Sequence, residues 1–155
     1  MRDDFTRKTQ TAFACLRQYS TVRYTSGKCG NQDRDGVIVD AGVFRVRLAR
    51  DGPYVLAEIA AQGLPSVWMF LDDVYVGLGM TPVPVSDGEL WLARLQRLAR
   101  SICGRFEALS STLSQSRLAD TLQRARSHSE AQTRMKRQLC HGFRRRPAVR
   151  RSVWT

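Results

Sequence analysis

The sequence predicts an α+β fold. We expect an N-terminal helix, a small antiparallel sheet of three to four strands, and a long C-terminal amphipathic helix followed by a basic helix and tail. Two patterns predict this class. Strand-like alternation is confined to the middle of the chain, whereas apolar residues recur at helical spacing on both sides of it. At 155 residues and 43% hydrophobic content, the chain is long enough to bury a core without metals or disulfides.

The first residues predict a helix over 3–19. Asp3 and Asp4 carry negative charge where a helix N-terminus favours it. Further along, apolar residues fall near one face: Phe5, Ala12, Phe13, Leu16 and Tyr19. Residues 24–36 are rich in glycine, asparagine and aspartate, a composition typical of a loop.

A hairpin is predicted next. Residues 43–48 alternate apolar side chains with arginines, which indicates a half-buried strand. We expect 37–39 to begin this strand, with a bend at Gly42. Residues 50–53 are a turn signal, and 54–59 predict the returning strand.

Two short apolar runs, 67–71 and 74–78, flank Asp72 and Asp73. Periodicity alone does not separate a second hairpin from a buried helix here. The runs are rich in β-branched and aromatic residues, so we favour two strands with the carboxylates at their turn. The prolines in 81–85 then predict an extended linker.

The clearest predicted helix runs from about residue 88 to 114. Ser86 or Asp87 suits its N-cap, and Glu89 completes a capping-box pattern with Ser86. Its apolar stripe recurs at intervals of three and four: Trp91, Leu95, Leu98, Ile102, Phe106, Leu109 and Leu113. Four arginines lie off the stripe and are expected on an outer face that needs no ligand: Arg94, Arg97, Arg100 and Arg105.

A second helix is predicted over 117–140, with a stop at Gly142 and a disordered basic tail after it. Its apolar stripe is thin, so we expect the helix to be peripheral or completed by a partner. The predicted organisation is a globular domain over 1–116 and a basic extension over 117–155.

Charge is distributed unevenly along the chain. Residues 1–90 contain 10 Lys and Arg against 11 Asp and Glu, whereas residues 91–155 contain 15 against 3. Within the first part, 51–90 hold six acidic residues and no basic one. Arginine accounts for 22 of the 25 cations, and its planar fork suits phosphate and carboxylate.

The basic extension predicts the function. We expect a small non-catalytic accessory protein that binds nucleic acid, mainly through phosphate contacts that are salt-sensitive and weakly sequence-specific. Phe143 and Trp154 are candidates for stacking on bases. Ten cations are the candidate binding residues: Arg124, Arg126, Arg134, Lys136, Arg137, Arg144, Arg145, Arg146, Arg150 and Arg151.

Two alternatives stay open for the same residues. In the first alternative, the protein is a protein–protein interaction module, such as an adaptor, chaperone or inhibitor. Its basic helix would then dock an acidic partner, the acidic stretch of its own chain, or another copy of itself. The remaining alternative is a solvated face without a specific role.

No pattern predicts an enzyme, a metal, a cofactor or a small-molecule substrate. Glu58, Asp72 and Asp73 lack the nearby lysine that a metal-dependent nuclease site usually has. His128, Cys140 and His141 do not complete a tetrahedral metal site. Glycine-loop and nucleophile-elbow motifs are incomplete or missing.

The sequence also predicts a cytoplasmic location. Its start lacks the apolar segment of a secretory signal, and the longest apolar stretch, 64–71, is too short to span a bilayer. The four cysteines are widely spaced, so we expect free thiols in a reducing compartment. In a eukaryote, the basic tail would suit a nuclear signal.

Overall fold

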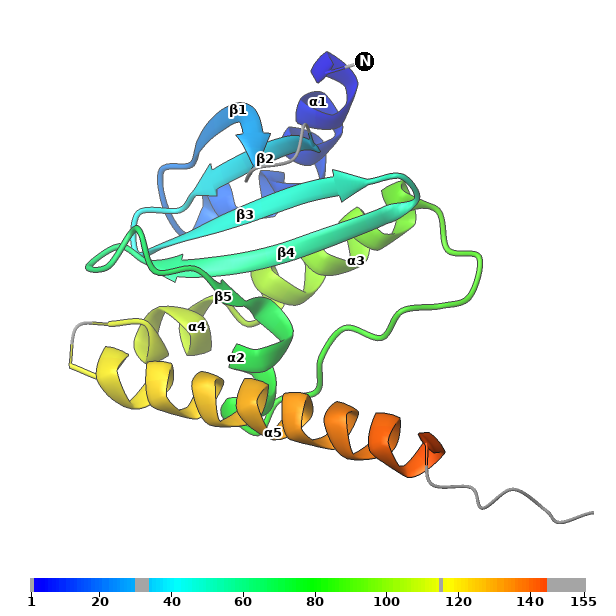
Figure 1. Ribbon diagram of the computed structural model, residues 1–155. Coiled ribbons are helices and arrows are strands. Elements are labelled where there is room, and N and C mark those ends of the chain that lie inside the picture. The colour runs from blue at the N-terminus through cyan, green and yellow to red at the C-terminus, as the bar shows by residue number, and fades with distance from the viewer. Residues whose placement is uncertain (1, 30–33, 115, 145–155) are drawn as a thin grey trace, which may run out of the picture.

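The computed structural model describes residues 2–29, 34–114 and 116–144. It shows one antiparallel sheet with helices on one face and along one edge (Figure 1). The α+β class and the long C-terminal helix are confirmed, but the sheet has five strands instead of three to four. The strands are hydrogen-bonded in chain order: β1 Arg23–Cys29, β2 Arg34–Asp40, β3 Phe44–Asp51, β4 Tyr54–Ala61 and β5 Met69–Phe70.

The expected loop over 24–36 is wrong. β1 and β2 form a ladder there, which runs from Arg23 opposite Asp40 to Cys29 opposite Arg34. β2 is therefore a strand of its own and not the start of β3. Polar residues and glycine suit β1 because it is an edge strand, where pairing with β2 outweighs weak local preference.

The β3–β4 hairpin is confirmed. The two strands pair along their whole length, with Asp51 opposite Tyr54 at the turn and Gly52 at a φ of 58°. Successive side chains of each strand point alternately to the inner and the outer face of the sheet. The inward-facing side chains of β3 are fully buried: Phe44, Val46 and Leu48.

The predicted N-terminal helix is two elements, an α-helix α1 (Arg2–Ala12) and a 3₁₀ helix η1 (Phe13–Gln18). They pack against the inner face of the sheet and against helix α3 (Trp91–Gly104). Phe5, Phe13 and Leu16 are buried in this layer.

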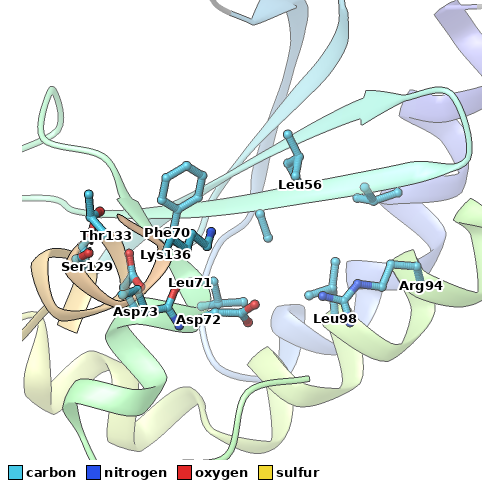
Figure 2. Close-up of a pocket in the computed structure, with 13 residues that line it drawn as sticks. Leu56, Phe70, Leu71, Asp72, Asp73, Arg94, Leu98, Ser129, Thr133 and Lys136 are labelled. Carbon is cyan, nitrogen blue, oxygen red and sulfur yellow. Dashed lines mark hydrogen bonds between the residues drawn. The ribbon is translucent and has the colours of Figure 1, made fainter. Parts of the chain in front are cut away.

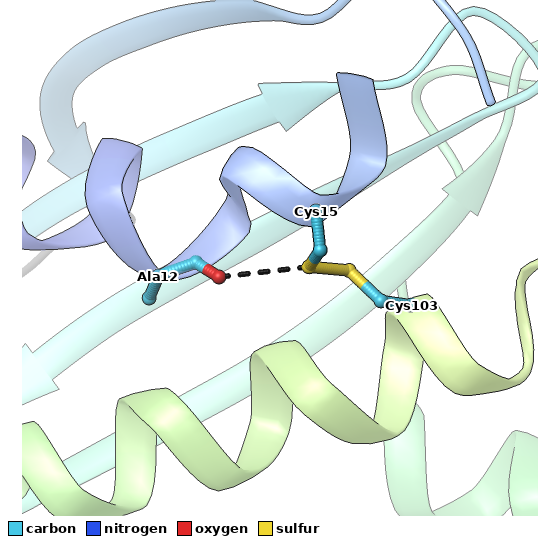
Figure 3. Close-up of a disulfide and its surroundings, with 3 residues drawn as sticks. All are labelled: Ala12, Cys15 and Cys103. Carbon is cyan, nitrogen blue, oxygen red and sulfur yellow. Dashed lines mark hydrogen bonds between the residues drawn. A yellow bond between two sulfur atoms is a disulfide. The ribbon is translucent and has the colours of Figure 1, made fainter. Parts of the chain in front are cut away.

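A disulfide joins η1 to α3, from Cys15 to Cys103 (Figure 3). The Cα atoms of the two cysteines are 6.1 Å apart, although 88 positions separate them in the sequence. The expectation of free thiols is wrong at these two positions. Apolar packing of η1 on α3 brings the two sulfurs together, a proximity that sequence spacing does not reveal.

The second predicted hairpin is also wrong. Only two residues form β5, and the chain then enters helix α2 (Leu71–Gly77). Leu71, Val74 and Tyr75 are buried at helical spacing, so burial of this face outweighs the β-propensity of the run. Asp72 and Asp73 lie in the first turn of α2, where the helix dipole favours negative charge, and not in a hairpin turn.

α2 ends at a glycine-dependent cap. The Gly79 N–H donates to Val76 O at 3.0 Å, and the Met80 N–H donates to Tyr75 O at 2.8 Å. Gly79 has a φ of 71°, the left-handed conformation that this type of helix end requires.

The long helix predicted from residue 88 is two helices, α3 and α4 (Phe106–Thr112), with a break at Arg105. Its apolar stripe is confirmed, because every residue of the predicted stripe is buried except Trp91, which is partly buried. The predicted N-cap is wrong: Leu90 occupies the cap without a side-chain bond. The predicted contact between Glu89 and Ser86 is present, because the Ser86 N–H donates to Glu89 Oε2 at 3.5 Å. Glu89 also accepts a shorter hydrogen bond from Arg97 Nη1 at 2.6 Å, and such charge-assisted bonds are strong.

Helix α5 (Leu118–Arg144) follows along the β5 side of the molecule (Figure 1). It continues through Gly142, so the predicted stop is wrong. A glycine inside a helix costs only about 1 kcal/mol, which is not enough to end it. None of the helices in the described ranges is both long and apolar enough to cross a membrane.

Candidate nucleic-acid interface

The first half of α5 is packed against α2. Leu118, Thr121 and Ala125 are buried there, and Thr121 Oγ1 donates to Thr112 O at 2.9 Å. The helices approach closely at Gly77, where an added Cβ would lie 3.2 Å from the Cβ of Arg124. Within this half, the thin apolar stripe is therefore covered by the protein's own α2.

His128 marks the end of this packed half. Its Nδ1 lies 2.7 Å from Asp73 Oδ1, and the two side chains are only 20% and 14% exposed. The pair links α5 to the first turn of α2. Cys140 and His141, the other members of the rejected metal grouping, have side chains outside the described part.

Beyond His128, the surface of α5 changes character. Every side chain described from 129 to 138 is exposed, including the apolar Met135 at 62%. Figure 1 shows the last turns of the helix extending past the body of the molecule. This half of α5 is therefore accessible around most of its circumference.

Three of the predicted binding residues gather on one side of α5. At about 100° per residue, Arg126, Arg134 and Arg137 fall within an arc of about 80°, whose centre is about 120° to 140° around the helix from the buried Leu118 and Ala125. We call these three arginines the outward face.

The outward face also contains one carboxylate. Glu130 Oε2 lies 3.8 Å from Arg134 Nη2, and the two side chains are 68% and 77% exposed. Exposed pairs of this kind contribute between about 0 and 1 kcal/mol, so Arg134 is readily released to another anion.

The other predicted residues are placed differently. Arg124 lies beside Gly77 and pairs with Asp120, at 3.1 Å between Nη2 and Oδ2. Lys136 is on the inner side of α5 and lines a hollow shared with Asp72 and Asp73. The remaining five side chains lie outside the described part: Arg144, Arg145, Arg146, Arg150 and Arg151, as do Phe143 and Trp154.

The acidic residues do not converge on one point. Glu58 pairs with Arg47 at 2.6 Å on the open face of the sheet, and Asp73 is bonded to His128. Burial raises the pKa of Asp72 above its ordinary value, and the positive charge of Arg94 opposes the shift. In the described part of the chain, no three His, Cys, Asp or Glu side chains gather so as to hold a metal ion.

The arginines of α3 have a role that the sequence analysis missed. The expectation of a solvated outer face is wrong for Arg94, which is 8% exposed and donates from Nη1 to Val83 O at 2.8 Å and Pro84 O at 3.0 Å. Arg105 Nη1 likewise donates to Thr81 O at 2.8 Å. These bonds hold the extended 81–85 segment against α3. The signal available in the sequence was an extended proline-containing segment, whose carbonyls need donors from elsewhere.

Comparisons with protein-family models, with curated proteins and with solved structures gave no match. The outward face of α5 is the candidate interface, because its three clustered arginines are all exposed.

Proposed function

We propose that this protein is a non-catalytic accessory protein that binds nucleic acid through phosphate contacts made by the outward face of α5. The observation that carries the proposal is the exposure of every described side chain from 129 to 138, with Arg134 and Arg137 among them. A helix with one packed half and one free half can present cations to a ligand without unfolding.

The charge of the chain supports this proposal. The net charge is +11, and the excess lies in the part of the sequence that contains α5. A positive field of this kind speeds the encounter with a polyanion. Arginine forms two parallel hydrogen bonds with a phosphate group, which makes the arginine bias favourable for such contacts.

The proposed binding is electrostatic and weakly sequence-specific. Each phosphate neutralised on duplex DNA adds about 0.9 to the slope of log affinity against log salt. Three arginines of the outward face would therefore contribute a slope of about −2.7. Cations beyond the described part of the chain would add to this value.

The test compares two triple variants of the full chain. The first is Arg126→Gln, Arg134→Gln and Arg137→Gln. The matched control removes three cations from other surfaces: Lys8→Gln, Arg23→Gln and Arg100→Gln. Binding of a labelled 20-base-pair DNA and a labelled 20-nucleotide RNA is followed by fluorescence anisotropy as salt is raised.

We expect the α5 variant to lose most of its affinity and about 2.7 of the slope for duplex DNA. The control should lose much less. Equal loss in the two variants, or no binding of either probe by the wild-type protein at low salt, contradicts the proposal. If the outward face is required for binding polyglutamate and not nucleic acid, the acidic-protein alternative takes its place.

Substitution is a better test than deletion of α5. Leu118, Thr121 and Ala125 are buried against the rest of the protein. Removing the helix would therefore expose α2 and change stability as well as charge.

A further inference from the structure

The outer edge of β4 is only partly paired. β5 covers this edge at Glu58 and Ile59, whereas residues 54–57 pair with β3 on their inner side and with no strand of the described part on their outer side. Asp51 and Tyr54 close a two-residue turn, so the alternation of an antiparallel ladder directs the N–H and C=O groups of every second residue outward. In this stretch, those residues are Val55 and Ala57.

This edge borders a groove. Two hollows, of about 380 and 350 Å³, adjoin one another and share Val55, Leu56, Asp72 and Arg94 as lining residues. The inner side of α5 forms one wall, with Ser129, Thr133 and Lys136 (Figure 2). The chain segment 85–89 forms a wall at the other end. We call this the β4 groove.

Two charged groups at the centre of the β4 groove have unused hydrogen-bonding capacity. Arg94 is buried, and both of its hydrogen bonds leave from Nη1, so Nε and Nη2 have no partner among the described residues. The Asp72 carboxylate likewise has neither a hydrogen bond nor an ion pair in the described ranges. Both side chains extend into the space between α2 and α3 in Figure 2.

The rim of the groove is apolar and exposed. Large apolar side chains surround the two charged groups, and each is between 41% and 66% exposed: Tyr54, Leu56, Phe70 and Val85. Clustered exposed apolar residues with a polar centre are typical of interaction sites.

We propose that the β4 groove binds an extended segment of a partner protein, which adds to β4 as a further strand beside β5. The main chain of this segment would pair with Val55 and Ala57, and Arg94 would donate to one of its carbonyls. A Lys or Arg of the segment would meet Asp72, with apolar side chains two positions away on either side. Strand addition of this kind takes its affinity from the main chain and its specificity from alternate side chains.

The shape of the groove favours a single strand over a second copy of this protein. The free edge of four residues is about 13 Å long. It lies between the α2–α5 wall and segment 85–89, so an intact sheet cannot reach it. In a second copy the same edge is recessed in the same way, and two such edges cannot lie side by side.

The first experiment identifies and measures a ligand. A phage library of random nonapeptides is selected on the full-length protein, and an enriched peptide is labelled for anisotropy. We expect alternating apolar residues around a Lys or Arg. Asp72→Asn should weaken binding about tenfold or more, whereas Glu107→Gln, which removes the same charge from an exposed site on α4, should have no effect.

The second experiment tests the main-chain contacts. Ala57→Pro removes an outward N–H, and an edge strand tolerates this change. We expect it to weaken the peptide about tenfold or more. If this variant fails to fold, the same peptide N-methylated at alternate amides tests the same hydrogen bonds from the ligand side.

Three results would overturn the proposal. The first is a selection that enriches no peptide. The second is an enriched peptide that binds Asp72→Asn and Ala57→Pro as tightly as the wild type. The third is self-association of the wild-type protein that Ala57→Pro abolishes, because this would assign the groove to a second copy.

Discussion

At the scale of single residues, Arg94 and Asp72 lie in one groove but differ in how folding satisfies them. Arg94 is buried and bonded to two carbonyls of the 81–85 segment. Asp72 loses part of its hydration and gains no hydrogen bond in the described part of the protein. The first side chain stabilises the fold, whereas partial burial disfavours the charge of the second, and the positive charge of Arg94 offsets only part of this effect.

This difference gives a pH-dependent prediction for Asp72→Asn. Burial raises the pKa of Asp72, so the folded chain binds this proton more tightly than the unfolded chain does. At pH 7.5 the variant should have a higher free energy of unfolding than the wild type. Because Asp72 is exposed, we expect the gain to be about 0.5 kcal/mol or less. The gain should disappear as pH falls through the pKa of Asp72, because the carboxyl group is then neutral.

Urea unfolding at pH 7.5 and pH 3.5 measures this effect. A variant that is less stable than the wild type at pH 7.5 would show that the charged carboxylate has a partner. The experiment also serves the peptide-binding test, since a stable Asp72→Asn protein cannot lose affinity through misfolding.

Arg94→Met should destabilise the protein by about 2 to 3 kcal/mol. The substitution removes two charge-assisted hydrogen bonds and leaves the carbonyls of Val83 and Pro84 without donors. Arg100→Met is the matched control, because Arg100 is exposed on the same helix and should change stability by less than about 0.5 kcal/mol. Urea unfolding gives both values, and equal effects would contradict the role assigned to Arg94.

The role of Arg94 could not be predicted from its position in the helix. The stripe of α3 places it next to the apolar face, but its burial depends on segment 81–85 crossing over it. The three clustered arginines of α5 were predicted as part of a larger set. The sequence did not separate them from Lys136, which faces the other side, because no pattern shows where α2 contacts α5.

At the scale of elements, the contact between α2 and α5 depends on Gly77. An added Cβ would lie 3.2 Å from Arg124 Cβ and 3.3 Å from its carbonyl carbon, so the backbone of α5 must move to make room. We expect Gly77→Ala to destabilise the protein by about 1 kcal/mol, because overpacking outweighs the gain in helix propensity.

Gly104→Ala is the control for this substitution. Gly104 also lies in a helix, but nothing lies within 4 Å of an added Cβ. It should leave stability unchanged or raise it by up to about 1 kcal/mol. Thermal or urea unfolding compares the two variants, and a Gly77→Ala protein as stable as Gly104→Ala would show that α5 is free to shift.

Elements with a clear period were predicted well, and elements set by their neighbours were not. The alternation of 43–48 and the stripe of α3 both correspond to observed elements. β1 and α2 were missed, because pairing with β2 and burial of Leu71, Val74 and Tyr75 override what the local composition indicates. Neither the length of these two segments nor the glycines beside them reveals the pairing of β1 or the burial of α2.

At the scale of the whole molecule, the Cys15–Cys103 disulfide connects the N-terminal layer to α3. The chain-entropy argument gives a closed loop of this length a stabilisation of about 4 to 5 kcal/mol. We therefore expect reduction to lower the free energy of unfolding by about this amount. Cys29→Ser is the control and should keep the wild-type response to reductant.

Thiol titration in denaturant checks the bond directly. In protein purified without reductant, reduction should release two further reactive thiols, those of Cys15 and Cys103. Four thiols before reduction would contradict the disulfide. The bond also weighs against the cytoplasmic location proposed from the sequence, because disulfides persist mainly in oxidising compartments.

The order of the sheet has a consequence for how the chain is made. Each strand pairs with the strand before it, so hairpins can form as soon as they leave the ribosome. Helix α1 and η1 are synthesised before α3 and α4, yet Phe5 packs on Trp91 and Tyr19 stacks on Phe106. Until α3 and α4 emerge, Phe5 and Tyr19 lack these aromatic partners, so a growing chain must keep the two rings from other contacts while the whole sheet is being made.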